Sequence, residues 1–473
     1  MSKKAKIAIV GGGVAGASTA LYLSKLNVEV TLFERESSLV NGPPFCHLHA
    51  GGNLYPDISD EQCIKLLKQS IDFLRFYPNV VDYRPTVIAL PSYCSSKPNN
   101  LLPRLEKLQK EYAQLIKNDP KNRVLGESES YYRLYSQEQI EKLKEGETSD
   151  PLDRWMIPVA QNIDLSKVQF PLILVQEYGL NLFRLGASVG LALDRLKSVN
   201  LQFNTTVTDI KREEECWSIT SKKEEKSQQE HFDYLINATG FRTGKIDDFL
   251  DVPCKKMVEF KAAYVTQWKQ GEKTLFPEII FHGERGTPQG MGQFTPYPNG
   301  YFQLHGMTNE ITLYKDGLVA STALSCQPQL KPNFIEKIEK SWSSDEVEQR
   351  TNSAIEHLSR FIPAFSDAKV GSKPLFGAQQ IPGDDPSLRV AEVSFPTKRY
   401  ARCEIVKVSS VIDMIEAIVE QLILLGYIDG SVKRGKTDSM LELNEEDITA
   451  LAEQICEERG YPKMLAHRSV LGL

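Results

Sequence analysis

The chain opens with a short apolar run that ends in a group of glycines. Residues 7–10, Ile-Ala-Ile-Val, are continuously apolar, which is typical of a strand buried in a parallel sheet. Residues 15–26 are rich in Ala and Leu and predict a helix, and residues 29–33 predict a second strand that ends at Glu34. Strand, turn, helix and strand form a βαβ unit, so the pattern predicts the start of a Rossmann-type sheet.

Later parts of the chain have a different pattern. Residues 81–90 predict a strand outside the first unit, and residues 101–119 predict a charged helix. Four short strand-like runs follow, each bounded by Gly, Pro or Asn: residues 260–268, 278–283, 291–298 and 301–308. They predict a large mixed sheet. Residues 350–365 predict an amphipathic helix, and a long apolar helix begins near residue 410.

Composition narrows the class of protein. With 41% hydrophobic and 25% charged residues, the chain has the composition of an ordinary globular protein. Its 473 residues are too many for one simple core. The net charge of -6 does not favour nucleic-acid binding. The eight cysteines show no zinc spacing, so we expect reduced thiols in a cytoplasmic protein and no metal site. No run of about 18 apolar residues predicts a transmembrane helix, and peripheral membrane contact stays open.

The glycines after the first strand form a dinucleotide-binding signature. Gly11, Gly13 and Gly16 give G-x-G-x-x-G between a strand and a helix, with Glu34 about 20 residues on. Gly11 permits the tight turn, Gly13 lets the backbone approach a pyrophosphate, and Gly16 lets the helix pack on the strand. The helix N-terminus attracts the anion, and Glu34 is expected to bind the ribose hydroxyls. The signature itself does not distinguish NAD from FAD.

A second element favours FAD. Residues 232–244 read as an apolar strand running into Ala238, Thr239 and Gly240, small residues that allow close approach to a cofactor. Together with the signature and the His-Ala-Gly-Gly segment at residues 49–52, this strand resembles the FAD-dependent oxidoreductases of the D-amino-acid oxidase superfamily. In style the motifs, spread over residues 6–425, are nearest to L-2-hydroxyglutarate dehydrogenase and malate:quinone oxidoreductase-like members.

The resemblance implies an α/β fold in which a Rossmann-type FAD-binding domain is interleaved with an α+β substrate domain on a large mixed sheet. Residues 1–80, 170–255 and 370–425 are assigned to the FAD-binding domain. Residues 81–169 and 256–369 are assigned to the substrate domain, and 426–473 to a polar helical tail without chemistry. The implied cofactor-binding residues are Gly11, Gly13, Val14, Ala15, Gly16, Glu34, Arg35, His49, Ala50, Gly51, Val207, Ala238, Thr239, Gly240, Lys407, Val408 and Ser409.

His49 is the candidate catalytic residue. In the resembled family this segment leads to the flavin ring, where small residues allow contact and an imidazole can accept a proton. His49 is therefore expected to be a base, a flavin neighbour or a covalent attachment point, whereas His47 is expected to lie away from the reactive edge. Pro43 and Pro44 replace the Ser- and Asn-rich lead-in of the family, which puts its usual pyrophosphate contacts in doubt.

A second expected flavin contact lies before the last long helix. Relatives have a glycine-rich turn there, but residues 400–410 contain no glycine. Lys407 could supply positive charge to reduced flavin, and Ser409 and Ser410 are possible contacts. The alternative is that Ser409 only caps the helix.

The resemblance implies an enzyme that takes a hydride from the α-carbon of a small carboxylate, a 2-hydroxy acid or an amino acid, and passes electrons to a quinone or oxygen. An arginine would bind the carboxylate. The candidates are Arg84, Arg242, Arg285 and Arg402. Two alternatives remain: a flavin monooxygenase or halogenase, suggested faintly by the Arg154–Pro158 segment, and a non-catalytic FAD-binding protein.

Overall fold

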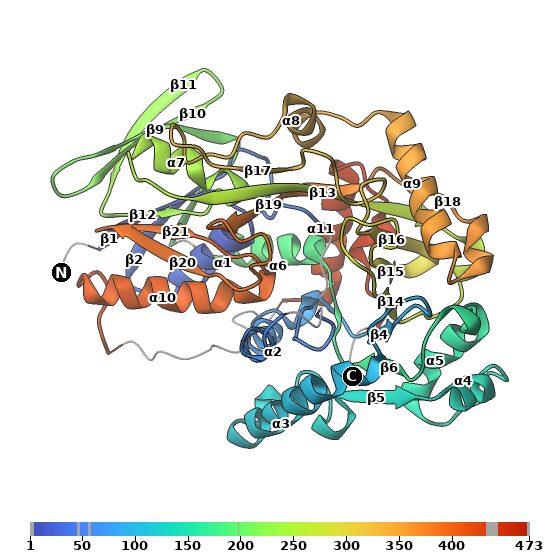
Figure 1. Cartoon of the computed structure of the whole chain (residues 1–473). Helices are drawn as coiled ribbons and strands as arrows, with labels where there is room; N and C mark the ends of the chain where they lie inside the picture. The colour runs from blue at the N-terminus through green and yellow to red at the C-terminus, as the bar shows by residue number, and fades with distance from the viewer. Residues whose placement is uncertain (1–3, 45–47, 55–57, 197, 432–442, 471–473) are drawn as a thin grey trace.

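A computed structural model describes residues 4–44, 48–54, 58–196, 198–431 and 443–470 (Figure 1). His47 and Tyr55 lie outside the described residues. None of the described helices is both long and apolar enough to cross a membrane.

The N-terminal βαβ unit belongs to a six-stranded sheet in the described chain. Its strand order is β20 (Val393–Thr397), β21 (Tyr400–Cys403), β12 (Tyr234–Asn237), β1 (Ala5–Val10), β2 (Val28–Phe33) and β8 (Val199–Gln202). All pairs are parallel except β20 with β21. The strands thus come from widely separated parts of the sequence, as a Rossmann-type sheet with a returning Asn-Ala-Thr-Gly strand requires.

Both faces of the six-stranded sheet are covered. On one face α1 (Val14–Leu23) packs against α6 (Leu182–Asp194) and α10 (Val411–Leu424). On the other, the antiparallel strands β9 (Thr205–Arg212), β10 (Trp217–Lys223) and β11 (Lys226–Phe232) pack through Trp217, Ile219 and Phe232 against Ala8, Val10 and Leu235. The sheet is therefore buried on two sides, which explains its continuous apolar strands.

A second, ten-stranded mixed sheet in the described chain extends from the first (Figure 1). Its main path is β17 (Leu318–Ala320), β13 (Lys256–Gln267), β16 (Tyr301–Gly306), β15 (Gly292–Pro296), β14 (Glu278–Phe281), β4 (Thr86–Ala89), β6 (Leu172–Val175) and β5 (Tyr132–Tyr135). Strands β18 (Lys369–Val370) and β19 (Leu375–Pro382) pair with β13. This mixed architecture confirms the expected fold class; where one domain ends and the other begins stays a prediction.

One face of the ten-stranded sheet supports a large apolar core. Val87, Tyr264, Ile279, Phe281, Phe294 and Leu304 cluster there with residues of α5 (Pro151–Asn162) and α9 (Ser344–Ser359). The predicted helices are close to those observed. Helix α3 spans Leu102–Asn118, against a prediction of 101–119, and α9 begins and ends about six residues earlier than the predicted helix at 350–365. The remaining described elements are α2 (Asp60–Phe76), α4 (Gln137–Leu143), α7 (Thr243–Phe249), α8 (Pro332–Glu339), β3 (Val81–Asp82) and β7 (Gly179–Leu180).

The C-terminal segment differs from the polar tail expected from sequence. Helix α11 (Glu445–Glu458) buries Ile448, Ala452 and Ile455 against α6 and β13, in the middle of the molecule (Figure 1). Arg459 donates hydrogen bonds to the carbonyl oxygens of Leu39 and Val40 at 2.8 and 2.9 Å. Frequent acidic residues give this segment its polar pattern, but its apolar residues share one face of α11 and pack against both α6 and β13.

Candidate functional site

The glycine signature forms a tight turn between β1 and α1. Gly11 has a φ of +101°, and a β-carbon there would lie 2.5 Å from the carbonyl oxygen of Ala238. A β-carbon on Gly16 would lie 1.9 Å from the carbonyl oxygen of Gly11. Glycine is therefore required at both positions, by backbone conformation at the first and by helix packing at the second.

The N-terminus of α1 is open where the pyrophosphate is expected. Gly13 is the N-cap residue; among the described residues, no side chain caps the helix, and a β-carbon added at Gly13 would meet no atom within 4 Å. Val14 and Ala15 form the first turn. Gly240, beside Ala238 and Thr239 at the end of β12, has the same open space around it and a φ of +61°. An uncapped helix terminus beside open space suits an anion.

Glu34 stands at the end of β2 and is only 7% exposed. Its carboxylate accepts the backbone N–H of Gly12 at 2.6 Å and that of Glu36 at 2.9 Å. Burial raises the pKa of this carboxyl above its usual value, and the two N–H groups oppose that effect. Each carboxylate oxygen has a second lone pair, so Glu34 can still accept hydrogen bonds from ribose hydroxyls.

Two other expected nucleotide contacts lie nearby with different surroundings. Arg35 forms ion pairs with Glu36 at 3.1 Å and with Glu339 of α8 at 3.5 Å, and its side chain is 38% exposed. Val207 lies on β9, half-buried against the core between the three-stranded and six-stranded sheets.

The His-Ala-Gly-Gly loop is fixed by its backbone. Leu48 N–H donates to the carbonyl oxygen of Tyr178 at 2.9 Å, and Ser70 Oγ donates to the carbonyl oxygen of His49 at 3.1 Å. Ala50 is fully buried, while His49 is half-buried. Gly51 has a φ of +100°, and a β-carbon there would lie 2.6 Å from the carbonyl oxygen of Cys63. Small residues are thus needed here to pack the loop onto α2.

A carboxyl group that the sequence reasoning missed lies under this loop. Glu177 is fully buried, and its Oε1 accepts the N–H of Gly52 at 2.5 Å. Backbone N–H groups of Ala50 and Asn53 also favour the ionised form, but burial dominates and raises the pKa of Glu177 to about 8. The only signal in the sequence is an acidic residue directly after the apolar run 172–175, which by itself is unremarkable.

Helix α2 contacts both segments that are expected to bind the flavin, the loop of His49 and the turn before α10. Lys407, Val408 and Ser409 lead into α10; Lys407 is half-buried and Ser409 is buried. Ser410, not Ser409, is the N-cap residue of α10, and its Oγ donates to Oε1 of Gln69 at 2.8 Å. Gln69 is the neighbour of Ser70, which holds His49. Two segments about 360 residues apart are therefore positioned by adjacent residues of one helix.

The ten-stranded sheet turns a polar face toward the first sheet. The same face of β13 carries Ala263 and Val265, which pack against residues of α6 and α11. Strand pairing and alternation place a row of polar side chains on this face, all buried except the half-buried Lys261: Thr86, Glu259, Lys261, Glu278, His282, Gln293, Thr295, Gln303 and His305. Sequence reasoning missed them, although the alternation in Glu-Ile-Ile-Phe-His at 278–282 is a detectable signal.

Positive charge gathers at one end of this face. Glu259 pairs with Lys261 at 2.7 Å and with Arg285, and Lys261 also donates to Gln379 at 3.1 Å. Burial lowers the pKa of Lys261, and Arg285 and Arg389 lower it further while Glu259 opposes them. Gln379 donates to the carbonyl oxygen of Val406 at 3.3 Å. The group thus has more cations than carboxylates and adjoins the segment that contains Lys407.

Two of the four candidate arginines are placed elsewhere. Arg84 contacts the polar face through Glu278 at 2.6 Å, but it is 3% exposed and also pairs with Asp82 at 3.2 Å. Arg402 pairs with Asp247 at 3.1 Å and Glu404 at 2.8 Å. Arg242 pairs with Glu339, the partner of Arg35. Arg285, which pairs with Glu259 of the polar face and has a side chain 37% exposed, is the more accessible of the two arginines at this face.

Comparisons with known proteins agree with this geometry. Residues 6–163, about a third of the chain, match the family described as FAD dependent oxidoreductase. No curated protein sequence matches. The fold is similar to that of L-proline dehydrogenase from P. horikoshii, with a TM-score of 0.57, 14% identity, and 91% of this chain and 96% of that chain covered. It is also similar to FAD-bound glycerol-3-phosphate dehydrogenase from Bacillus halodurans (TM-score 0.58, 13% identity, 98% and 74% covered) and to glycine oxidase from Geobacillus kaustophilus (0.57, 11%, 93% and 100%).

The residues present fit FAD. The required glycines at 11 and 16, the open helix terminus at Gly13 and the buried carboxylate of Glu34 suit a dinucleotide. The match to the family and the shared fold extend that fit to a flavin. Residues 6–163 therefore match the FAD dependent oxidoreductase family, and the chain shares its fold with the FAD-dependent dehydrogenases and oxidases named above.

Proposed function

We propose that this enzyme oxidises a small carboxylate substrate, a 2-hydroxy acid or an amino acid, at its α-carbon. The observation that carries the proposal is the excess of positive charge formed by Lys261, Arg285 and Glu259 on the polar face of the ten-stranded sheet. A guanidinium and an ammonium in a half-buried site favour a carboxylate over a neutral ligand. Proteins with similar folds include a glycine oxidase, an L-amino acid deaminase and a glycerol-3-phosphate dehydrogenase. The fold therefore does not select the substrate class, and the proposal depends on the charged residues of this site.

The position of the cation group supports its role. Pro43 lies against Gly377 of β19, and Gly377 is the register partner of Lys261 on β13. Gln379, two residues on, contacts both Lys261 and the carbonyl oxygen of Val406. The cations thus lie between the loop that leads to His49 and the turn that leads to α10. A carboxylate bound there would be next to both segments expected to contact the flavin.

His49 is the proposed base. When bound, FAD would accept the hydride from the α-carbon. The proton on the substrate oxygen or nitrogen then needs an acceptor, and an imidazole on a loop held by Ser70 and Glu177 is suited to that task. His282 stands on the polar face; burial lowers its pKa to about 4, so it is neutral at pH 7 and a weak base. Electrons would then pass to a quinone or to oxygen.

The halogenase alternative gains no support from the position of its motif. The Arg154–Pro158 segment lies in α5, with Met156 and Pro158 buried in the helical layer behind the ten-stranded sheet. It does not line the polar face, so its likeness to a halogenase motif carries no functional meaning.

The test is anaerobic flavin reduction with a panel of 2-hydroxy acids, amino acids, glycerol phosphates and neutral amines. We expect a hydroxy or amino acid to bleach the flavin. Arg285→Met should raise the KM for that substrate about 10- to 100-fold, the loss of one charge-assisted hydrogen bond. Arg242→Met, which removes an arginine paired with Glu339, is the matched control and should leave KM unchanged. Bleaching only by glycerol phosphates or neutral amines would overturn the proposal.

A further inference from the structure

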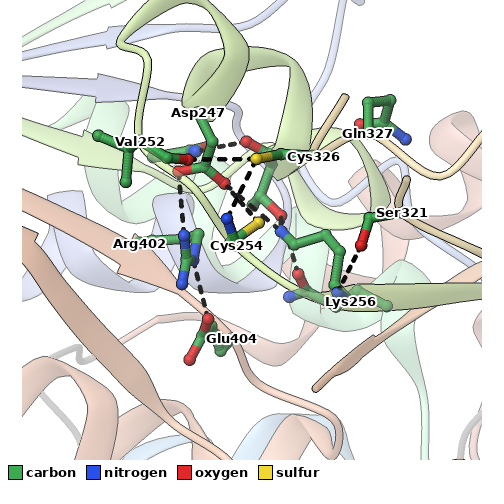
Figure 2. Close-up of polar contacts among 12 residues, drawn as sticks. Asp247, Val252, Cys254, Lys256, Ser321, Cys326, Gln327, Arg402 and Glu404 are labelled. Carbon is green, nitrogen blue, oxygen red and sulfur yellow. Dashed lines mark hydrogen bonds and ion pairs between the residues drawn. The ribbon is translucent and has the colours of Figure 1, made fainter. Parts of the chain in front are cut away.

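Two cysteines share a surface cavity on the far side of the six-stranded sheet from α1. The cavity, about 1230 Å³, is lined by α7, the start of β13 and the loop 320–326, and includes both Cys254 and Cys326. Each cysteine is half-buried, and Leu324 on the same loop is 97% exposed. Figure 2 shows both sulfur atoms inside the cluster of polar contacts at this cavity. A small solute can therefore reach the thiols.

The two cysteines are in direct contact. The backbone N–H of Cys254 donates to Sγ of Cys326 at 3.2 Å, and Sγ of Cys326 donates to the carbonyl oxygen of Val252 at 3.2 Å. Since a backbone nitrogen is two bonds from its own β-carbon, Cys326 Sγ lies within about 6 Å of the β-carbon of Cys254. A disulfide needs β-carbons about 3.5–4.5 Å apart, which a side-chain rotation and a small loop movement can provide.

Two consecutive carboxylates of α7, Asp247 and Asp248, hold the two cysteines. Asp247 accepts from Sγ of Cys254 at 3.5 Å, and it is fixed in turn by Arg402 at 3.1 Å and Lys256 at 3.7 Å (Figure 2). Asp248 accepts from the N–H of Cys326 at 2.6 Å and from Ser325 Oγ at 2.6 Å. The pair, 72 residues apart in sequence, is thus positioned from one helix rather than brought together by chance.

We propose that Cys254 and Cys326 form a reversible intramolecular disulfide when hydrogen peroxide oxidises the protein. Cys326 is the sulfur that reacts first, because its Sγ accepts the N–H of Cys254 and so already lies beside the second cysteine. Its sulfur attacks one peroxide oxygen: an S–O bond forms, the O–O bond breaks, and hydroxide leaves as water with the proton that the thiol gave up.

Cys254 then completes the reaction. Its sulfur attacks the sulfur of the Cys326 sulfenic acid, and its thiol proton passes to the departing oxygen. An S–S bond forms, the S–O bond breaks, and hydroxide leaves as water with that proton. In total, two thiols are oxidised and one hydrogen peroxide is reduced to two waters. Burial, the main cause, raises the pKa of the Cys254 thiol to about 12, in keeping with its role as the second sulfur.

The bond would brace the back of the cofactor-binding region. Gly244 of α7 lies so close to the loop that a β-carbon there would be 2.5 Å from the carbonyl oxygen of Cys326. Helix α7 directly follows the Thr239–Gly240 turn. Closing a loop of this length reduces the freedom of the unfolded chain, so the oxidised protein should unfold at a higher temperature than the reduced one.

The test uses the FAD-loaded full chain, reduced, desalted and treated with hydrogen peroxide, then alkylated and digested without reductant. Mass spectrometry should find a peptide pair joined through Cys254 and Cys326, lost again after dithiothreitol. Cys254→Ser should instead leave a sulfenic acid on Cys326 that dimedone traps. Cys94→Ser, a half-buried cysteine outside the cavity, is the matched control and should keep the link.

The wild-type digest decides the question even where a variant folds poorly. Absence of the link while other cysteines are oxidised would overturn the proposal, as would Cys326 pairing with another cysteine. Neither result would affect the proposed substrate, because the peroxide is added from solution.

Discussion

Glu177 under the His-Ala-Gly-Gly loop gives a prediction with a definite sign. Its carboxyl is fully buried, and its pKa is raised from 4.5 to about 8. Between these pH values the folded protein holds a proton on Glu177 that the unfolded chain has released. The contribution of Glu177 to the free energy of unfolding should therefore be greatest below pH 4.5, fall as the pH rises, and level off above pH 8.

The substitution Glu177→Gln isolates this contribution. Glutamine keeps the shape and an oxygen that can accept the N–H of Gly52, but it does not titrate. The two proteins should be similarly stable at pH 5. Each further pH unit should favour the variant by about 1.4 kcal/mol, reaching about 4 kcal/mol near pH 8. Other groups, including His282, titrate in both proteins and cancel in the difference.

Urea denaturation of both FAD-saturated proteins at pH 5, 6, 7 and 8 measures the difference in unfolding free energy directly. A difference that stays constant with pH would refute the reasoning. A difference that falls with pH would show that the three N–H groups of Ala50, Gly52 and Asn53 outweigh burial and keep the carboxylate ionised.

Three further predictions concern the cofactor and the loops. Gly13→Val should fold normally, because its side chain meets open space, yet bind FAD at least about tenfold more weakly by absorbance titration. The control Gly190→Ala, where the nearest atom to the added β-carbon is 3.9 Å away, should bind FAD normally. Equal FAD content in the two variants would contradict the assignment of the pyrophosphate site. His49→Ala should slow anaerobic flavin reduction by about 10²–10⁴ and His47→Ala much less; equal, small losses would reduce the segment to a backbone support. Arg459→Met should lower the unfolding free energy by about 1–3 kcal/mol, since it leaves the carbonyls of Leu39 and Val40 without their donor; an unchanged denaturation midpoint would show that α11 packing alone holds this junction.

The sequence by itself determined the cofactor class and the architecture. Gly11 and Gly16 are local requirements, because a turn and a helix–strand contact within one βαβ unit demand them wherever the rest of the chain goes. The same is true of the strand that ends at Asn237, whose continuous apolar residues predict the buried parallel strand that pairs with β1.

The surroundings of His49 were decided by tertiary structure. Alternation in residues 278–282 shows that one strand face is polar, but not that this face of the sheet is the one that packs against α6 and α11. Nothing near Glu177 in sequence reveals that its carboxyl ends among the backbone N–H groups of a loop 125 residues away. Gln69 and Ser70 join the loop of His49 to the N-terminus of α10 only because α2 packs between them. Such pairings are set by how sheets and helices stack, which depends on the burial of whole faces and not on any local residue pattern.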